Sequence, residues 1–130
     1  MSNDFDTAQQ QGIVPWQDLA WQERDILVFR DGFPVTNGHL LFVPMNNNQD
    51  NIVSCMRRAL AAGDDMVSKG LCEAYNVGIN CGKAAGQTVR YPHVHLIPRR
   101  YGDTPDPVGG VRHVVAGQGN YHTDSYKIPR

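Results

Sequence analysis

The sequence predicts an α+β domain in which an antiparallel sheet packs against one long helix. Three observations lead to this prediction. Short β-like apolar segments lie before residue 45, one segment with helical periodicity covers about residues 50–74, and further β-like segments follow it. Strands, one helix and then strands are typical of an antiparallel α+β sandwich, whereas a parallel sheet needs alternating strands and helices. The 130 residues suit a single domain, residues 1–130.

The N-terminal residues are expected to contribute little to this domain. Residues 1–15 begin with the polar segment MSNDFDTAQQQG, which we expect to be a flexible arm. It lacks the basic start and apolar centre of a secretory signal peptide. No apolar run approaches the roughly 18 residues that cross a membrane. Three cysteines without CxxC spacing predict reduced thiols and a cytoplasmic location, and neither a disulfide framework nor a cysteine zinc site.

Two strands joined by a turn are predicted before the helix. Residues 26–29 form the β-like centre of RDILVFRDGF, and GHLLFVP forms a second strand that ends at Pro44. The intervening residues, DGFPVTNG, are rich in the Gly, Pro and Asn that turns require. These two strands therefore form a hairpin or a meander.

The long helix is predicted over about residues 50–74. The segment NNNQDN before it is rich in helix-capping residues. Its apolar face recurs at steps of three and four residues: Ile52, Met56, Leu60, Gly63, Val67 and Leu71. Gly63 and Gly70 each weaken a helix by about 1 kcal/mol relative to alanine, or allow another element to pack closely.

Strands and irregular structure are predicted after the helix. NVGIN indicates a strand, CGKAAG a loop, and the segment from Gln87 to Pro98 another strand. Proline and glycine then interrupt the chain, with one short strand expected at Val111–Val115 and an irregular tail over residues 116–130.

Charge is distributed unevenly along the chain. Residues 1–75 carry five Lys or Arg and ten Asp or Glu, a net charge of −5, whereas residues 76–112 have a net charge of +3. The basic segment surrounds two histidines and would attract a small anionic ligand, although a solvated surface explains it equally well. The basic excess is too small for a general nucleic-acid-binding protein.

The segment GQTVRYPHVHLIPRR contains the chemistry-bearing residues. His93 and His95 share one face of an extended strand, and Tyr91 joins them if the strand already runs there. Pro92 favours a strand that begins only near His93, with Tyr91 displaced. The pair has three interpretations, namely structural histidines, a metal site, or catalysis at phosphorus.

The metal and the phosphorus interpretations need different neighbours. A metal needs a third ligand, for which His39 or His113 are available. Catalysis at phosphorus uses neutral imidazole as a nucleophile and needs donors for phosphate oxygens. The glycines of GKAAGQT allow backbone N–H groups to approach an anion, and Gln87 and Thr88 add side-chain donors.

These residues resemble the histidine-triad (HIT) family. GQTVRYPHVHLIPRR is similar to the family motif of three alternating histidines after Gly-Gln-Ser/Thr-Val, with Tyr91 in place of the first histidine. The upstream segments NCGKAAGQT and RDGFPVTNGHLLFVP are also similar to the family, so the resemblance covers about residues 20–115. It implies an antiparallel sheet of about five strands with one long helix, a homodimer joined into one larger sheet, and binding of a nucleotide phosphate.

The resemblance also implies roles for individual residues. His93 corresponds to the nucleophile, His95 to a phosphate contact, and His39 to a histidine that supports the triad. The remaining positions correspond to contacts with phosphate, ribose and base, which are Asn80, Gln87 and Thr88 for phosphate, Asp31 for ribose, and Phe29 and Phe33 for the base.

The implied function is hydrolysis or nucleotidyl transfer at the α-phosphate of a nucleotide conjugate, through a nucleotidyl-histidine. GKAAGQTV and HLIPRRYGD are closer to the dinucleoside polyphosphate branch than to the nucleoside phosphoramidases, which are the alternative. Tyr91 cannot shuttle protons near pH 7, because the ordinary pKa of tyrosine is about 10. A nucleotide-binding protein with little or no turnover therefore remains a second interpretation. The N-terminal paired cysteines that hold zinc in some relatives are absent, so we expect neither a structural zinc nor a cofactor.

Overall fold

The computed structural model describes residues 2–129. The chain divides into two compact units, one ending at Arg100 and the other beginning at Tyr101. The sequence predicted a single domain over residues 1–130. The five strands and the long helix belong to the first unit, and residues 101–129 belong to the second.

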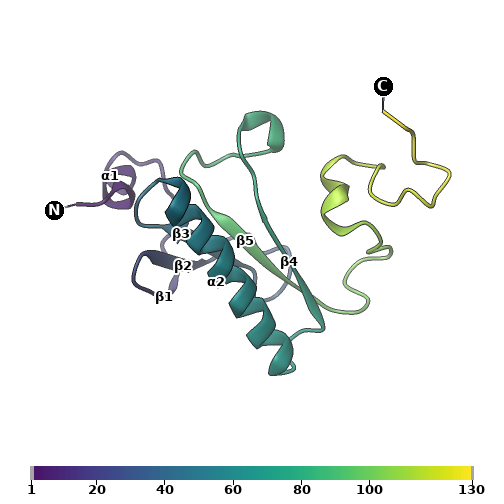
Figure 1. Cartoon of the computed structure of the whole chain (residues 1–130), viewed down its shortest axis with the longest axis horizontal. Helices are drawn as coiled ribbons and strands as arrows, with labels where there is room; N and C mark the ends of the chain where they lie inside the picture. The colour runs from purple at the N-terminus through teal and green to yellow at the C-terminus, as the bar shows by residue number, and fades with distance from the viewer. Residues whose placement is uncertain (1, 130) are drawn as a thin grey trace. The chain divides into compact units, whose positions relative to one another are not determined.

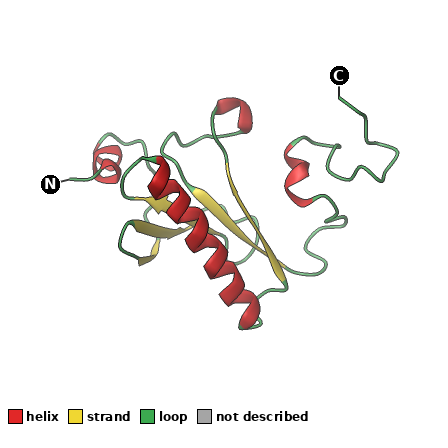
Figure 2. Ribbon diagram, in the orientation of Figure 1, coloured by secondary structure: helices red, strands yellow, loops and turns green. Residues whose placement is uncertain are grey.

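The first unit contains a five-stranded antiparallel sheet, as predicted. Its strands, in spatial order, are β1 (Leu19–Gln22), β2 (Ile26–Arg30), β3 (Leu40–Pro44), β5 (Val94–Arg99) and β4 (Ala74–Ile79). The long helix α2 (Gln49–Ser68) crosses one face of this sheet (Figure 1; helices red and strands yellow in Figure 2). The α+β class and the antiparallel sheet are therefore confirmed.

The central strands are buried on both faces because each face has its own cover. In β2, Ile26 and Val28 belong to the core beneath α2, whereas Leu27 and Phe29 belong to a second core on the other face. This alternation follows from the two-residue period of a strand. The second core, which also contains Phe5 and Tyr91, is here called the N-terminal cluster.

The expected flexible arm is instead an ordered part of this second core. Helix α1 (Asp4–Gln10) begins with a capping box between Asn3 and Asp6. Phe5 is 5% exposed, and its backbone N–H donates to the carbonyl of Met45 at 2.9 Å. The arm was predicted from polarity alone, but a few apolar residues are sufficient to anchor the helix on an open sheet face.

Strand β1 was not predicted. It has only four residues, a register shift between Leu19 and Trp21, and mostly exposed side chains, so it has no clear alternation in the sequence. It pairs with β2 and forms one edge of the sheet.

The long helix is shorter than predicted at its C-terminal end. Asn48 caps its first turn by accepting from the N–H of Asn51 at 2.9 Å. The helix ends at Ser68, and Gly70 follows with φ +72°, a conformation that terminates helices readily. Gly63 does allow close packing, because a Cβ there would lie 2.7 Å from the ring of Tyr75 on β4.

The strand that carries the histidines begins after Pro92, as that proline indicated, and does not extend back to Gln87. Residues 80–93 form a loop with a short 3₁₀ helix at Lys83–Ala85, and β5 begins at Val94. His93 therefore lies immediately before the strand and His95 within it. Strand β5 also continues past Pro98 to Arg99.

The second unit contains a 3₁₀ helix, Gly110–Val114, where a short strand was expected. Gly109 and Gly110 both have positive φ, which breaks an extended strand. The guanidinium of Arg112 donates to the carbonyl of Gly119 and lies over the ring of Tyr121. Residues 116–129 contain neither helix nor strand.

Within residues 2–129, no helix has both the length and the apolar character needed to cross a membrane.

Candidate active site

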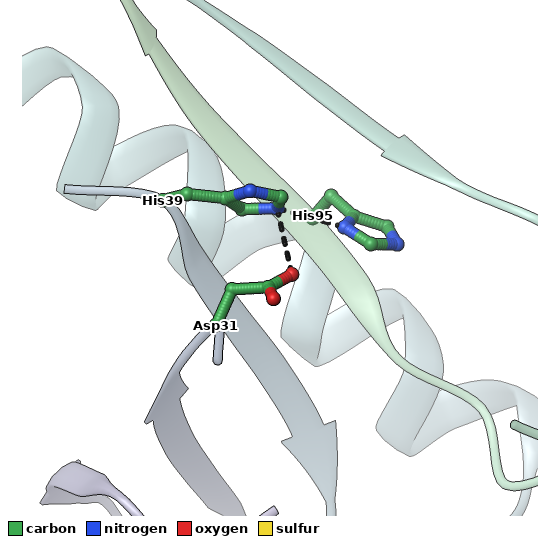
Figure 3. Close-up of side chains that lie close together, drawn as sticks. All are labelled: Asp31, His39 and His95. Atoms are coloured by element: carbon green, nitrogen blue, oxygen red, sulfur yellow. Dashed lines mark hydrogen bonds and ion pairs between the residues drawn. The ribbon is translucent and has the colours of Figure 1, made fainter. Parts of the chain in front are cut away.

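Three strand ends bring the histidines together. Asp31 directly follows β2, His39 directly precedes β3, and the hydrogen bond from Asp31 N–H to the carbonyl of His39 closes the turn between them. His95 lies on β5 opposite Leu41 of β3. Residues 56 positions apart therefore come into contact, and Figure 3 shows Asp31, His39 and His95 pointing toward one another.

A chain of hydrogen bonds determines which nitrogen of each of these imidazoles carries a proton. The N–H of Val35 donates to Nδ1 of His39 at 3.1 Å, so the proton of His39 is on Nε2. That Nε2 lies 2.9 Å from Nδ1 of His95 and 3.4 Å from Oδ2 of Asp31. Because Nδ1 of His95 accepts, neutral His95 carries its proton on Nε2.

Nε2 of His95 is a buried donor with no hydrogen-bond partner in the described structure. Burial, with smaller contributions from the neighbouring His93 and His39, lowers the pKa of His95 to about 4. Burial also lowers the pKa of His39. Both rings are therefore neutral near pH 7, and His95 carries a buried, unsatisfied N–H that an anionic oxygen would satisfy.

His93 is prepared for the complementary role. Its Nδ1–H donates to the carbonyl of Tyr91 at 2.9 Å, which leaves the lone pair on Nε2. The ring is 8% exposed and lies against His95, with centroids 5.1 Å apart. A buried imidazole with a fixed tautomer and an available lone pair can act as a nucleophile.

A metal ion is the alternative occupant of this cluster. One ligand atom each from Asp31, His39 and His95 lie within 4.8 Å of one another. Coordination through Nε2 of His39 would require its proton to move to Nδ1, which already faces the N–H of Val35. The hydrogen-bond direction therefore favours a proton-donating relay over a metal site. His113 was the other candidate for a third metal ligand. It lies in the second unit, with its Nε2 2.8 Å from the carbonyl of Val108.

Tyr91 is displaced from the face that carries the histidines, as Pro92 indicated. Its hydroxyl donates to the carbonyls of Pro44 and Met45, at 2.5 and 3.1 Å, and its ring meets Phe5 edge-on. Burial raises its pKa further above the ordinary value. Although Tyr91 stands at the place of the first histidine in the motif, its hydroxyl is directed at these carbonyls and not at His39. Tyr91 is a core residue, and only its backbone carbonyl reaches His93.

The predicted phosphate contacts divide into two groups. The side chain of Gln87 accepts from the N–H of Gly82 at 2.8 Å and donates to the carbonyls of Val89 and Arg90, both at 2.9 Å. The amide N–H groups of Gln87 are used to hold the loop together. Gln87 therefore contributes to the site by shaping this loop and not by contacting phosphate with its amide. Asn80, which is half-buried, and Thr88, which is exposed, belong to the same loop, and both remain predicted phosphate contacts.

Of the two predicted base contacts, Phe29 needs correction and Phe33 stays a prediction. Phe29 is 5% exposed and stacks on Phe5, so it is part of the N-terminal cluster and not an open wall. Phe33 is 93% exposed. Asp31, the predicted ribose contact, accepts from the N–H of Phe33 at 2.8 Å through Oδ1 and faces His39 through Oδ2.

Trp16 is the residue that sequence analysis missed. Its ring lies beside both His93 and Phe29, with centroid distances of 4.8 and 6.1 Å. The only local signal was an aromatic residue after Pro15 in a polar segment, which does not indicate proximity to a residue 77 positions away.

Comparisons with known proteins agree with this geometry. The HIT domain matches residues 17–102 of the chain. An uncharacterised HIT-like protein of Methanocaldococcus jannaschii is 29% identical over 98 residues, which cover 71% of this chain and 75% of the relative. The adenylylsulfatase HINT3 of Arabidopsis thaliana is 27% identical over 84 residues, which cover 59% of this chain and 43% of the relative.

Solved structures have the same fold. A zinc-bound histidine triad family protein from Mycobacterium smegmatis superposes with a TM-score of 0.62 at 29% identity, covering 78% of this chain and 83% of the other. A HIT family hydrolase from Legionella pneumophila superposes with a TM-score of 0.53 at 27% identity, covering 72% and 89%.

Proposed function

Because this chain belongs to the HIT family, whose members bind nucleotides and generally act as nucleotide hydrolases or transferases, we propose that it cleaves a nucleotide conjugate at its α-phosphate through a nucleotidyl-histidine on His93. Dinucleoside polyphosphates are the proposed substrates. The observation that supports this proposal most strongly is the pairing of opposite ring nitrogens, an available lone pair on His93 beside an unpartnered N–H on His95.

The proposed first step is displacement at phosphorus. Nε2 of His93 forms a bond to the α-phosphorus, the bond from phosphorus to the leaving oxygen breaks, and its electron pair departs with the remaining nucleoside polyphosphate. The N–H of His95 donates to a non-bridging oxygen as negative charge concentrates there. His39 supports this donor, because its own N–H is directed at Nδ1 of His95.

The second step regenerates the enzyme. A water oxygen attacks phosphorus, the phosphorus–nitrogen bond breaks, and the electron pair returns to Nε2 of His93. The proton of the water passes to solvent, and the product is a nucleoside monophosphate. Splitting one displacement into two is the general advantage of covalent catalysis.

The substrate class separates the proposal from its alternatives. We propose to incubate the protein with a dinucleoside tetraphosphate, an adenosine phosphoramidate and an adenylyl sulfate, the last suggested by the name of the Arabidopsis relative. Chromatography should show a nucleoside monophosphate released most rapidly from the dinucleoside tetraphosphate. Preference for the phosphoramidate would support the alternative enzyme class, and nucleotide binding without any turnover would support a binding protein.

No cofactor is proposed for this reaction, because the two histidines supply both the nucleophile and the charge-stabilising donor. The cytoplasmic location predicted from the cysteines is likewise retained as a proposal. Elemental analysis that finds a stoichiometric metal, together with activity that is lost to chelators and restored by that metal, would contradict the cofactor-free mechanism.

We also propose a homodimer. Val53, Leu60 and Val67 are exposed and recur every seven residues, so they form one apolar ridge along α2. Leu60 lies on the face of α2 that meets β4, because Gly63 and Asp64 in the following turn both contact Tyr75 of β4. The ridge therefore lies on the side of the free edge strand β4, and a second copy would cover both.

A further inference from the structure

The N-terminal segment places an aromatic ring against the proposed nucleophile. The indole of Trp16 lies 4.8 Å from the imidazole of His93, measured between centroids, with the ring planes inclined by 59°. His95 contacts the same imidazole at 5.1 Å and 61°. His93 thus has one aromatic neighbour from β5 and one from a segment that begins the chain.

This segment is held in place by contacts that do not involve Trp16. The backbone N–H of Asp4 donates to Oδ1 of Asn46 at 3.1 Å, and Oδ2 of Asp4 accepts from the N–H of Asn47 at 2.8 Å. The ring of Phe5 lies 5.9 Å from that of Tyr91. Helix α1 is therefore tied both to the end of β3 and to the residue whose carbonyl binds His93.

The orientation of the His93 ring has one polar restraint in the described structure. Nδ1–H donates to the carbonyl of Tyr91, and rotation of the ring by half a turn would break this bond and move Nε2 to the place of a ring carbon. Exposed imidazoles also exchange between two neutral tautomers. A packed indole opposes both processes, because it fills the space in which the ring would turn and excludes water from it.

We propose that Trp16 is a positioning residue, which holds the imidazole of His93 with Nδ1–H on the Tyr91 carbonyl and Nε2 toward the substrate. The catalytic consequence rests on the proposed function, whereas the orientation of the ring does not. Through Trp16, the ordered N-terminal segment would help to orient His93, a role that the histidine motif alone does not indicate.

The first test measures the ring nitrogens directly. Protein labelled with ¹⁵N-histidine would be studied by long-range ¹H–¹⁵N correlation, well above the ordinary histidine pKa of about 6.5, with His93→Gln identifying the signals. The unmodified protein should show one protonated and one unprotonated nitrogen for His93. Trp16→Ala should move both shifts toward the average of two tautomers, and Trp16→Phe should preserve them.

The control variant is Trp21→Ala. It removes the chain's other indole, which packs on Phe42 with centroids 5.9 Å apart in the core beneath α2. Thermal unfolding of all variants shows whether each is folded at the measuring temperature. If Trp21→Ala changes the His93 signals as much as Trp16→Ala does, or if Trp16→Ala leaves them unchanged, the proposal is overturned.

The second test is kinetic. Trp16→Ala should lower kcat by about tenfold to a hundredfold with KM within about twofold, because misplacing a reacting group affects the chemical step. Trp16→Phe should retain kcat within about threefold. A higher KM with unchanged kcat would identify Trp16 as a substrate-binding wall and overturn the positioning role. If the unmodified protein turns over none of the three substrates while Trp16→Ala still averages the tautomers, the proposed function fails and the positioning of His93 stands.

Discussion

At the scale of single residues, His93 and His95 are chemically identical side chains prepared for opposite tasks. The partner of Nδ1 makes the difference. In His93 it is a carbonyl, which requires a proton on Nδ1, and in His95 it is the N–H of His39, which forbids one. One ring therefore offers a lone pair on Nε2 and the other a proton.

The first prediction concerns the nucleophile. His93→Ala should abolish turnover of a dinucleoside tetraphosphate, because the covalent step has lost its attacking nitrogen. Binding of a mononucleotide, measured by calorimetry, should survive through Asp31, Asn80 and Thr88. His122→Ala, an exposed histidine of the second unit, is the control and should keep full activity. Full activity in His93→Ala would remove the mechanism.

The second prediction concerns Tyr91. Tyr91→His should give little or no gain in kcat, because this side chain is directed into the N-terminal cluster and away from His39. Urea unfolding should show lower stability, since the shorter imidazole loses the hydrogen bonds to two carbonyls, and leaving buried polar groups unpaired costs about 1–3 kcal/mol. A hundredfold rise in kcat would show instead that residue 91 can take part in acid–base catalysis.

The third prediction concerns pH. The pKa of His95 is about 4 in the folded protein and near the ordinary 6.5 in the unfolded chain, so between these values the unfolded chain binds the additional proton. The free energy of unfolding should therefore fall as the pH is lowered from about 6.5 toward 4. His39, whose pKa is also lowered, adds to the same trend. In urea titrations, His95→Asn should reduce this pH dependence, and an unchanged slope would contradict the assignment.

At the scale of elements, α2 and β4 pack closely because Gly63 of the helix has no side chain. Gly63 is buried in the helix, and the ring of Tyr75 occupies the space where a Cβ would stand. The hydroxyl of Tyr75 is also held by Oδ1 of Asp64 at 2.6 Å, so the ring is not free to move aside.

The fourth prediction follows from this contact. Gly63→Ala should destabilise the protein, because overpacking costs about 1–3 kcal/mol and outweighs the gain of about 1 kcal/mol in helix propensity. Thermal unfolding measures the difference, and adding Tyr75→Leu should reverse it. Ala61→Gly, at an exposed position of the same helix, gauges helix propensity alone. A stabilised Gly63→Ala protein would contradict the tight packing.

At the scale of the whole molecule, the proposed dimer would join the edge strand β4 and the exposed apolar ridge of α2 to a second copy. The fifth prediction is that light scattering gives about twice 14.5 kDa for the unmodified protein and about 14.5 kDa for Leu60→Glu, because a buried charge in an apolar interface is unfavourable. Leu71→Glu is the matched control, since Leu71 is equally apolar and exposed but lines a groove beside Trp21 of β1. A dimer that persists in Leu60→Glu would place the interface elsewhere.

The sequence by itself determined the class of the fold, the turn-connected strands β2 and β3, most of α2, and the two histidines of the motif. These features depend on residues close together in the chain, where apolar periodicity and turn residues act directly. The family could also be identified from short motifs, because its members carry particular residues at fixed spacing.

The tertiary structure decided what each side chain does. Tyr91 turned away from the histidines because carbonyls 46 and 47 positions earlier accept its hydroxyl hydrogen. Helix α1 became ordered because Phe5 could enter an apolar cluster on the second face of the sheet, which also brought Trp16 to His93. The protonated nitrogen of His95 depends on a residue 56 positions away. Such contacts follow from which surfaces remain uncovered after the sheet forms, and local sequence patterns contain no information about that.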